Sequence, residues 1–316
     1  MKVAAAQLAP AFLDRDATLD KVLDAIGTAA ADGVEMIAFP ETFVPGYPIW
    51  ADVTHASAFD RPDQKAAFAQ YLDAAVDIER GDLDTVVTVA AQLGIFVYLG
   101  VAERSPSSGS IYCSLVAIDP RRGIVGVHRK LKPTYGERLM WADGDGHGLV
   151  VHEQATSDDG SVRLSGLNCW ENWMPLARAA MWAQGPQVHV ATWPGSPAVA
   201  HDASRFVARE GRVFVVSAGA ILRIDDIADD FVLLDEMSDS GDRWSSGGSI
   251  IVGPDGETLA VADAHSEVIV TAEIDLVVQR AERQNFDPAG HYSRPDVLQL
   301  TVDRRRRTPA VFVDDA

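Results

Sequence analysis

Residues 161–193 read SVRLSGLNCWENWMPLARAAMWAQGPQVHVATW and contain a strand, a helix and a second strand in succession. The segments 161–168 and 188–193 are short apolar runs of the length expected for buried strands. Between them, residues 175–184 have the composition of a helix, with Pro175 in its first turn. This succession of elements predicts an α/β fold.

The same alternation continues on both sides of this stretch. Strands are predicted at 2–8, 34–39, 95–103, 213–217, 248–252 and 268–273, and helices at 17–31, 65–93 and 204–210. Residues 110–119 and 123–130 resemble a hairpin, so the sheets are expected to be mixed. Residues 225–242 are acidic and unpatterned, which predicts a long surface loop.

Domain organisation follows from the even composition of the chain. There is no Pro/Ser-rich linker, so we expect one domain over 1–300 and a short charged C-terminal tail over 301–316. Within that tail, the arginines at 304–307 are expected to be solvated or to contact a neighbouring subunit. The glycine-rich residues 144–148 lack the spacing of a phosphate or calcium loop and predict a surface turn.

Composition excludes several classes of function. The chain has 316 residues, a net charge of −19 and two cysteines, and this length can form a large core without disulfides. The acidic balance argues against a nucleic-acid partner. No apolar run of about 18 residues predicts a membrane span, and the first residues lack a signal-peptide core. Two cysteines and no leader predict a cytoplasmic protein.

Cys169 is the first candidate for chemistry, because it lies between a predicted strand and a predicted helix. Such a turn exposes a side chain to main-chain N–H groups and to a helix N-terminus, both of which stabilise negative charge. On position alone, Cys169 is either a nucleophile or a buried structural cysteine. Cys113 lies in a strand-like segment without polar neighbours in sequence and is expected to be a core residue.

Three charged residues follow other strands and are candidates for the same cleft. Glu41 comes directly after the buried strand 34–39, where burial would raise its pKa toward that of a general base. Lys132 precedes a proline after the strand 123–130, and Glu137 lies five residues further on. By contrast, Arg129 and Lys130 are expected to lie on a solvated face.

Taken together, these segments resemble the nitrilase superfamily of carbon–nitrogen hydrolases. The motifs FPETFVPGYP at 39–48, HRKLKPTYGER at 128–138 and CWEN at 169–172 are similar to those of the true nitrilase branch. The resemblance runs from residue 2 to about residue 300. It implies an α-β-β-α sandwich with mixed sheets and a homodimer or higher oligomer that pairs across helices flanking the cysteine.

The resemblance also implies a reaction and a set of roles. Cys169 would attack an organic nitrile, Glu41 would act as general base, and Lys132 would stabilise the charged intermediates, giving a carboxylic acid and ammonia. Glu137 would position Lys132 or the substrate. No cofactor and no metal is expected.

Substrate contacts are expected from aromatic side chains next to the catalytic segments, namely Tyr47, Trp170 and Trp193. Large side chains suit aromatic nitriles but also narrow a pocket to small aliphatic ones, so both classes stay open.

Three alternatives remain at this stage. An amidase or a cyanide-processing hydrolase would use the same residues, and a catalytically silent scaffold would share the fold. A metal-dependent hydrolase is disfavoured because the eight histidines form no His-x-x-x-His pair.

Overall fold

Two six-stranded mixed sheets form the centre of the part of the chain described by this computed structural model, residues 1–157, 160–308 and 310. The first sheet has the order β14-β1-β2-β3-β4-β5, with β14 (Val268–Glu273), β1 (Lys2–Gln7), β2 (Met36–Ala38), β3 (Phe96–Arg104), β4 (Ile111–Asp119) and β5 (Gly123–Arg129). The second has the order β13-β12-β9-β8-β7-β6, with β13 (Thr258–Val261), β12 (Ile250–Val252), β9 (Phe214–Gly219), β8 (Val188–Trp193), β7 (Ser161–Asn168) and β6 (His152–Ala155). The prediction of mixed sheets is confirmed.

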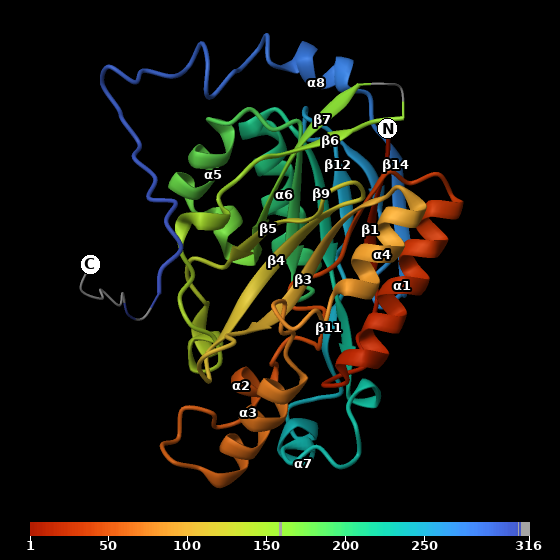
Figure 1. Cartoon of the computed structure of the whole chain (residues 1–316), viewed down its shortest axis with the longest axis vertical. Helices are drawn as coiled ribbons and strands as arrows, with labels where there is room; N and C mark the ends of the chain where they lie inside the picture. Colours follow the sequence, from red (N-terminus) through yellow and green to blue (C-terminus); the bar gives the residue numbers. More distant parts are fainter. Residues whose placement is uncertain (158–159, 309, 311–316) are drawn as a thin grey trace, which may run out of the picture.

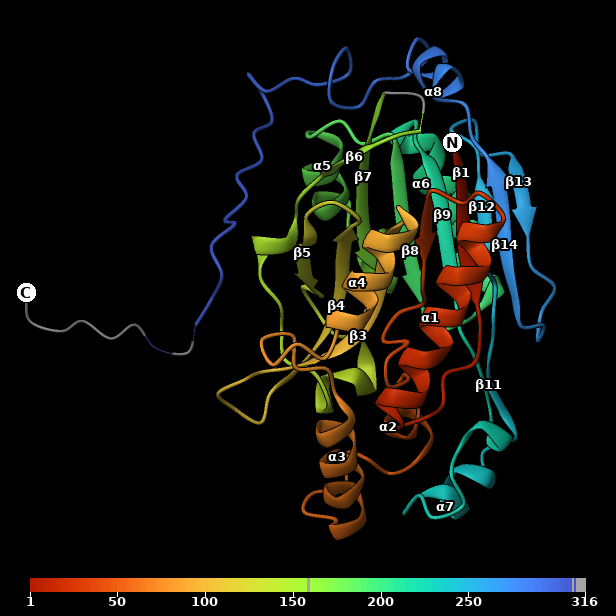
Figure 2. The same ribbon diagram turned by 45° about the vertical axis from the view of Figure 1, so that its right-hand side comes forward.

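Four helices cover the outer faces of the two sheets (Figures 1 and 2). On the first sheet lie α1 (Arg15–Ala31) and α4 (Asp84–Leu93), and on the second lie α5 (Pro175–Trp182) and α6 (Pro197–Gly211). Helix α1 begins at the N-cap Asp14, whose carboxylate accepts the Ala17 N–H at 2.9 Å, and it buries Val22 and Ile26 against the sheet. The result is the α-β-β-α sandwich that the resemblance implied.

The period-two alternation of the strands divides their side chains between two cores. In β1, Ala4 and Ala6 face the helices, whereas Val3 and Ala5 face the second sheet. Because both faces of the inner strands are buried, these strands are continuous apolar runs. Packing between the sheets therefore fixes which strand ends meet, and this determines where the site forms.

The remaining elements lie at the ends of the sandwich. At one end are α2 (Trp50–Val53), α3 (Pro62–Ala74), α7 (Leu234–Ser238) and the ribbon formed by β10 (Ile221–Arg223) and β11 (Arg243–Ser246); α8 (Leu276–Glu282) lies at the other (Figure 1). The 3-10 helices are η1 (Tyr135–Leu139), η2 (Gly146–Gly148), η3 (Cys169–Trp173) and η4 (Ile224–Asp226). No helix in the described ranges is long and apolar enough to cross a bilayer.

Three predicted segments differ from the structure. The helix expected over 204–210 is α6, which already begins at Pro197. The single helix expected over 65–93 is two helices, because Val76 between them exchanges main-chain hydrogen bonds with Ala102 and Arg104 of β3. The loop expected over 225–242 includes the short helix α7, which buries Met237 against Leu233 and Phe231.

Figure 1 shows the C-terminal segment running from α8 down one side of the sandwich. Arg306 donates to the Asp145 carboxylate at 3.1 Å and to the Val127 carbonyl at 3.0 Å, and the Arg307 N–H donates to the same carboxylate at 2.9 Å. The turn at 144–148 is thus a docking point for the chain's own tail, and Arg306 is not simply solvated. Residues 309 and 311–316 of the predicted tail lie outside the described residues.

Candidate active site

Cys169 lies on a tight turn where β7 ends and η3 begins. Its φ is +47°, in the left-handed region that is costly for a residue with a side chain. Reciprocal hydrogen bonds between Asn168 and Glu171 cap the turn, with the Asn168 N–H donating to Glu171 Oε2 at 2.9 Å. The main-chain N–H of Trp170 donates to the Cys169 sulfur. The predicted position of Cys169 at a strand-to-helix turn is therefore confirmed.

Two other segments of the site also have strained backbone. Thr42, directly after Glu41, has φ +41°, and Tyr135, two residues before Glu137, has φ +44°. Such conformations cost about 1–3 kcal/mol each and persist where the surrounding structure enforces them. Close packing against β3 helps to hold the strained backbone of Thr42, next to Glu41. A Cβ at Gly100 of β3 would overlap the carbonyl oxygen of the residue before Glu41, so only glycine fits there.

The buried lysine of the site is Lys130, directly after the end of β5. Its Nζ lies 2.8 Å from Glu41 Oε1 and 2.7 Å from Glu137 Oε2, and its side chain is 1% exposed. The expectation that Lys132 is the lysine in the cleft is wrong. The Lys132 side chain is 54% exposed, and its ammonium pairs with Asp143 at 2.8 Å.

The reason for this difference is the alternation of side chains at the end of β5. His128 and Lys130 are both buried, whereas Arg129 points the other way and pairs with Glu103. Because β5 ends at Arg129, Lys132 does not continue the buried row. The expectation of a solvated Lys130 fails for the same reason.

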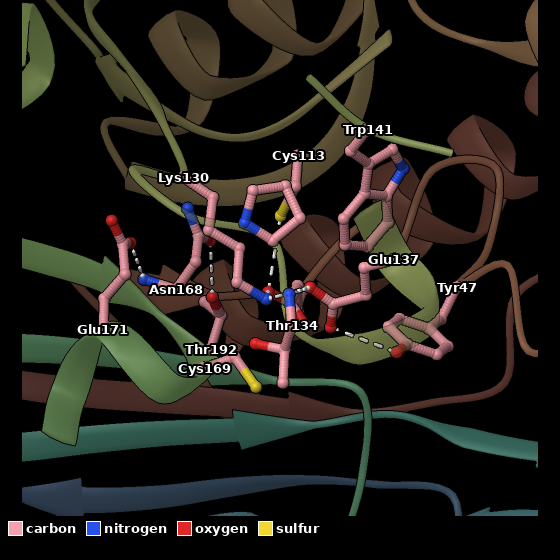
Figure 3. A network of polar contacts seen from close by, with 12 residues as sticks. Tyr47, Cys113, Lys130, Thr134, Glu137, Trp141, Asn168, Cys169, Glu171 and Thr192 are labelled. Carbon is pink, nitrogen blue, oxygen red and sulfur yellow. Dashed lines mark hydrogen bonds and ion pairs between the residues drawn. The ribbon is translucent and has the colours of Figure 1, made fainter. Parts of the chain in front are cut away.

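The structure brings together Glu41, Glu137 and Cys169, three of the residues expected to share one cleft. One carboxylate oxygen of each glutamate and the Cys169 sulfur lie within 4.8 Å of one another. Glu137 also accepts the Thr134 N–H at 2.6 Å, which fixes it in the first turn of η1. Figure 3 shows how Lys130 lies against Glu137, with Cys169 on the adjacent turn.

Burial and mutual charge determine the ionisation of these groups. Burial raises the pKa of Glu41 to about 7, with the charge of Lys130 opposing this rise and that of Glu137 adding to it. Burial and the charge of Glu41 raise the pKa of Cys169 well above its usual value. For Lys130, burial lowers the pKa, but the nearby acidic groups, Glu41 foremost, outweigh it and hold the pKa well above its usual value. The resting site therefore combines a neutral thiol, an ammonium and a carboxyl group that can take up a proton near pH 7.

Cys113 also belongs to this site, contrary to the expectation of a core residue without polar partners. Its sulfur lies 3.3 Å from Glu41 Oε1, and its carbonyl oxygen accepts the Lys130 N–H at 2.7 Å. Nothing near Cys113 in the sequence indicates this contact, because residues 41 and 113 meet only through the pairing of β3 with β4.

A buried carboxylate connects the lysine segment to the cysteine turn. Glu171 accepts the N–H of Leu131 at 2.7 Å and that of Asn168 at 2.9 Å, and it pairs with His128 Nε2 at 3.0 Å. Burial raises the pKa of Glu171, but the charge and hydrogen bond of His128 outweigh it, so the pKa is lowered. Glu171 thus fixes the position of the end of β5 relative to the end of β7.

The three expected substrate-contacting aromatics occupy different environments. Tyr47 is buried, and its hydroxyl lies 3.1 Å from both Glu137 Oε1 and Asp52 Oδ2 (Figure 3). Trp193 is buried, and its carbonyl accepts the Glu41 N–H at 3.4 Å. Trp170 is 49% exposed and contributes its main-chain N–H to the site instead.

The spacing of Glu41, Glu137 and Cys169 would also suit a metal ion. However, the Lys130 ammonium lies within 2.8 Å of both carboxylates and supplies the positive charge that a metal would bring. Lys130 therefore already neutralises part of the negative charge of Glu41 and Glu137.

The fold and the cysteine turn define a class of hydrolase, the one indicated by the sequence motifs. A family model described as carbon–nitrogen hydrolase matches residues 2–284. The chain belongs to this carbon–nitrogen hydrolase family.

Individual relatives agree with this assignment. The chain is 36% identical over 311 residues to a protein named Nitrilase 2 from an unknown prokaryotic organism, covering 98% of this chain and 94% of the relative. It is 37% identical over 323 residues to an aliphatic nitrilase from Rhodococcus rhodochrous, covering 98% and 84%. A solved carbon–nitrogen hydrolase from Helicobacter pylori superposes with a TM-score of 0.70 at 19% identity, covering 95% and 98%, and shares the fold.

Proposed function

We propose that this enzyme hydrolyses an organic nitrile to a carboxylic acid and ammonia through a covalent intermediate on Cys169. The observation that carries the proposal is that Cys169, Glu41 and Lys130 lie close together where strands of the two sheets end. Relatives about 36% identical over nearly the whole chain are named nitrilases, which supports the substrate class.

The first half of the reaction needs a thiolate and a proton for the nitrile nitrogen. Glu41, in its ionised form, takes the proton of the Cys169 thiol while the sulfur bonds to the nitrile carbon. Glu41 then returns this proton to the nitrogen, which gives a neutral thioimidate. A pKa of about 7 suits both the uptake and the return of the proton near neutral pH.

The second half consumes two waters. Glu41 assists addition of the first water to the thioimidate carbon, and the tetrahedral adduct breaks its carbon–nitrogen bond to release ammonia and leave a thioester. The second water breaks the thioester into the carboxylic acid and the free thiol. Lys130 and the Trp170 N–H stabilise negative charge that develops beside Cys169 in these steps.

Glu137 acts on Lys130 rather than on the substrate carbon in this proposal. Its Oε2 accepts from Lys130 at 2.7 Å, while its Oε1 lies 3.1 Å from the Tyr47 hydroxyl. This places the ammonium between two carboxylates. Tyr47 therefore orients Glu137, and its ring and that of Trp141, in edge contact at 5.6 Å, form an aromatic wall beside the site.

The test is ammonia release from a panel of aliphatic, arylacetic and aromatic nitriles, the matching amides, and cyanide, with and without a chelator. We expect release from nitriles, unaffected by chelation, and none from Cys169→Ala. Release from amides or cyanide alone would assign the site to the alternative hydrolases. Turnover by Cys169→Ala, or its loss on chelation, would contradict the mechanism.

We further propose that the enzyme is a homodimer paired across α5 and α6. Trp173, Leu176 and Phe206 on this face are 41%, 67% and 47% exposed, and the rings of Trp173 and Phe206 stack at 6.4 Å. Apolar groups gathered in this way favour burial by a second surface. Light scattering is expected to give a dimer or larger oligomer, and Leu176→Glu is expected to shift it toward the monomer.

A further inference from the structure

The two carboxylate oxygens of Glu41 have different surroundings. Oε1 accepts from Lys130 Nζ at 2.8 Å and lies 3.3 Å from Cys113 Sγ. Oε2 is buried and has no hydrogen-bond partner among the described residues. Two donors therefore hold Oε1, while Oε2 is free to accept a proton.

Cys113 is held in this position by its main chain as well as by its side chain. It pairs with Ala102 in the β3–β4 ladder, and its carbonyl accepts the Lys130 N–H at 2.7 Å. The same strand thus fixes both donors that reach Oε1. Rotation of the Glu41 carboxylate would break both of these contacts.

The thiol of Cys113 can only donate in this arrangement. Burial and the charge of Glu41 raise the pKa of Cys113 well above its usual value, so it stays protonated. An ionised carboxylate accepts hydrogen bonds and has no proton of its own to give. The 3.3 Å contact is therefore an S–H···O hydrogen bond from Cys113 to Glu41.

We propose that Cys113 is a positioning residue whose S–H, together with Lys130, holds Glu41 Oε1 and leaves Oε2 to take the proton of Cys169. This inference rests on the proposed role of Glu41 as the base, but not on the nature of the substrate. A hydrogen bond to the ionised form also favours that form, so the donor keeps Glu41 ionised to lower pH.

The test is the pH dependence of Cys169 alkylation by iodoacetamide, with the labelled cysteine located by mass spectrometry. Loss of the donor in Cys113→Ala is expected to move the acidic limb of this profile up by roughly 0.3–1 pH unit and to slow labelling about two- to tenfold at pH 6. Cys113→Ser, which restores a donor, is expected to bring the limb back toward that of the wild type. Cys113→Val fills the volume without a donor and serves if the alanine variant does not fold.

A matched control is available on the same strand. Ser114 points to the other face of β4, where its hydroxyl binds Glu103, so Ser114→Ala is expected to lower the unfolding free energy without moving the limb. The proposal is overturned if folded Ala or Val variants keep the wild-type limb, or if the serine variant shifts as far as they do. The alkylation assay contains no nitrile. If the ammonia assay refuted the substrate assignment, the alkylation result would still test the role of Cys113.

Discussion

Replacing Lys130 by methionine tests the electrostatic arrangement of the site most directly. Methionine keeps the apolar length of the side chain but removes the ammonium that lies 2.8 Å and 2.7 Å from the two buried carboxylates. Breaking a buried ion pair by deleting one partner costs about 3–5 kcal/mol, because the remaining charge is uncompensated. In Lys130→Met, part of this cost is relieved when Glu41 takes up a proton.

The effect on rate follows from that protonation. Glu41 has a pKa of about 7 while the charge of Lys130 is lowering it. An adjacent cation lowers a carboxyl pKa by about 1–3 units, so its removal leaves on the order of 1% of Glu41 ionised at pH 7. Loss of one charge-stabilising donor costs a further factor of about 10²–10³. We therefore expect kcat/KM for the nitrile to fall by at least about 10³.

The matched control is Lys132→Met, which removes a second lysine from the same segment. Its ammonium lies in an exposed pair with Asp143, worth about 0–1 kcal/mol. Ammonia release is expected to change less than about twofold, and urea denaturation to shift little. Inactivation by Lys132→Met together with near-normal activity of Lys130→Met would refute the reasoning.

Three further outcomes are expected. Because burial raises the pKa of Glu41 from 4.5 to about 7, its neutral form stabilises the fold fully below pH 4.5, and this contribution is lost as pH rises through 7. The stability of Glu41→Gln relative to the wild type should therefore rise by about 3 kcal/mol between those pH values, measured by urea denaturation; a flat difference would contradict this. Tyr47→Phe leaves Glu137 with one partner fewer and should lower kcat about three- to tenfold with little change in KM; a large rise in KM alone would instead indicate a substrate contact. Arg306→Ala loses its carboxylate partner at the start of η2 and should lower the unfolding free energy by about 1–2 kcal/mol, whereas Arg305→Ala, on a side chain that is 87% exposed, should not; equal effects would contradict the docking of the tail.

The sequence pattern predicted the mixed sheets and the cysteine turn because both depend on local patterns, whereas the four layers followed from the family resemblance. The alternation of short apolar runs with helices indicated the sheets, and Cys169 and Glu41 each follow a strand directly. Contact between these residues from different sheets then came from the family resemblance rather than from the pattern itself.

The lysine could not be assigned as readily, because the two candidates lie two residues apart. In a continuing strand both would point to the same face of the sheet. Choosing Lys130 over Lys132 requires the residue at which β5 ends, and strand ends are poorly determined by sequence. Cys113 was missed for a different reason. Its partner Glu41 is 72 residues away, and only the stacking of strands brings the two together.

The site also divides the chain into two complementary halves. Glu41 and Lys130 follow strands of the first sheet and Cys113 lies in one, whereas Cys169 follows β7 in the second. A cut between residues 140 and 151 would therefore yield two fragments, neither of which contains both base and nucleophile. Because β14 from the second fragment pairs with β1 of the first, the halves interlock, and hydrolysis regained on mixing would report reassembly of the sandwich.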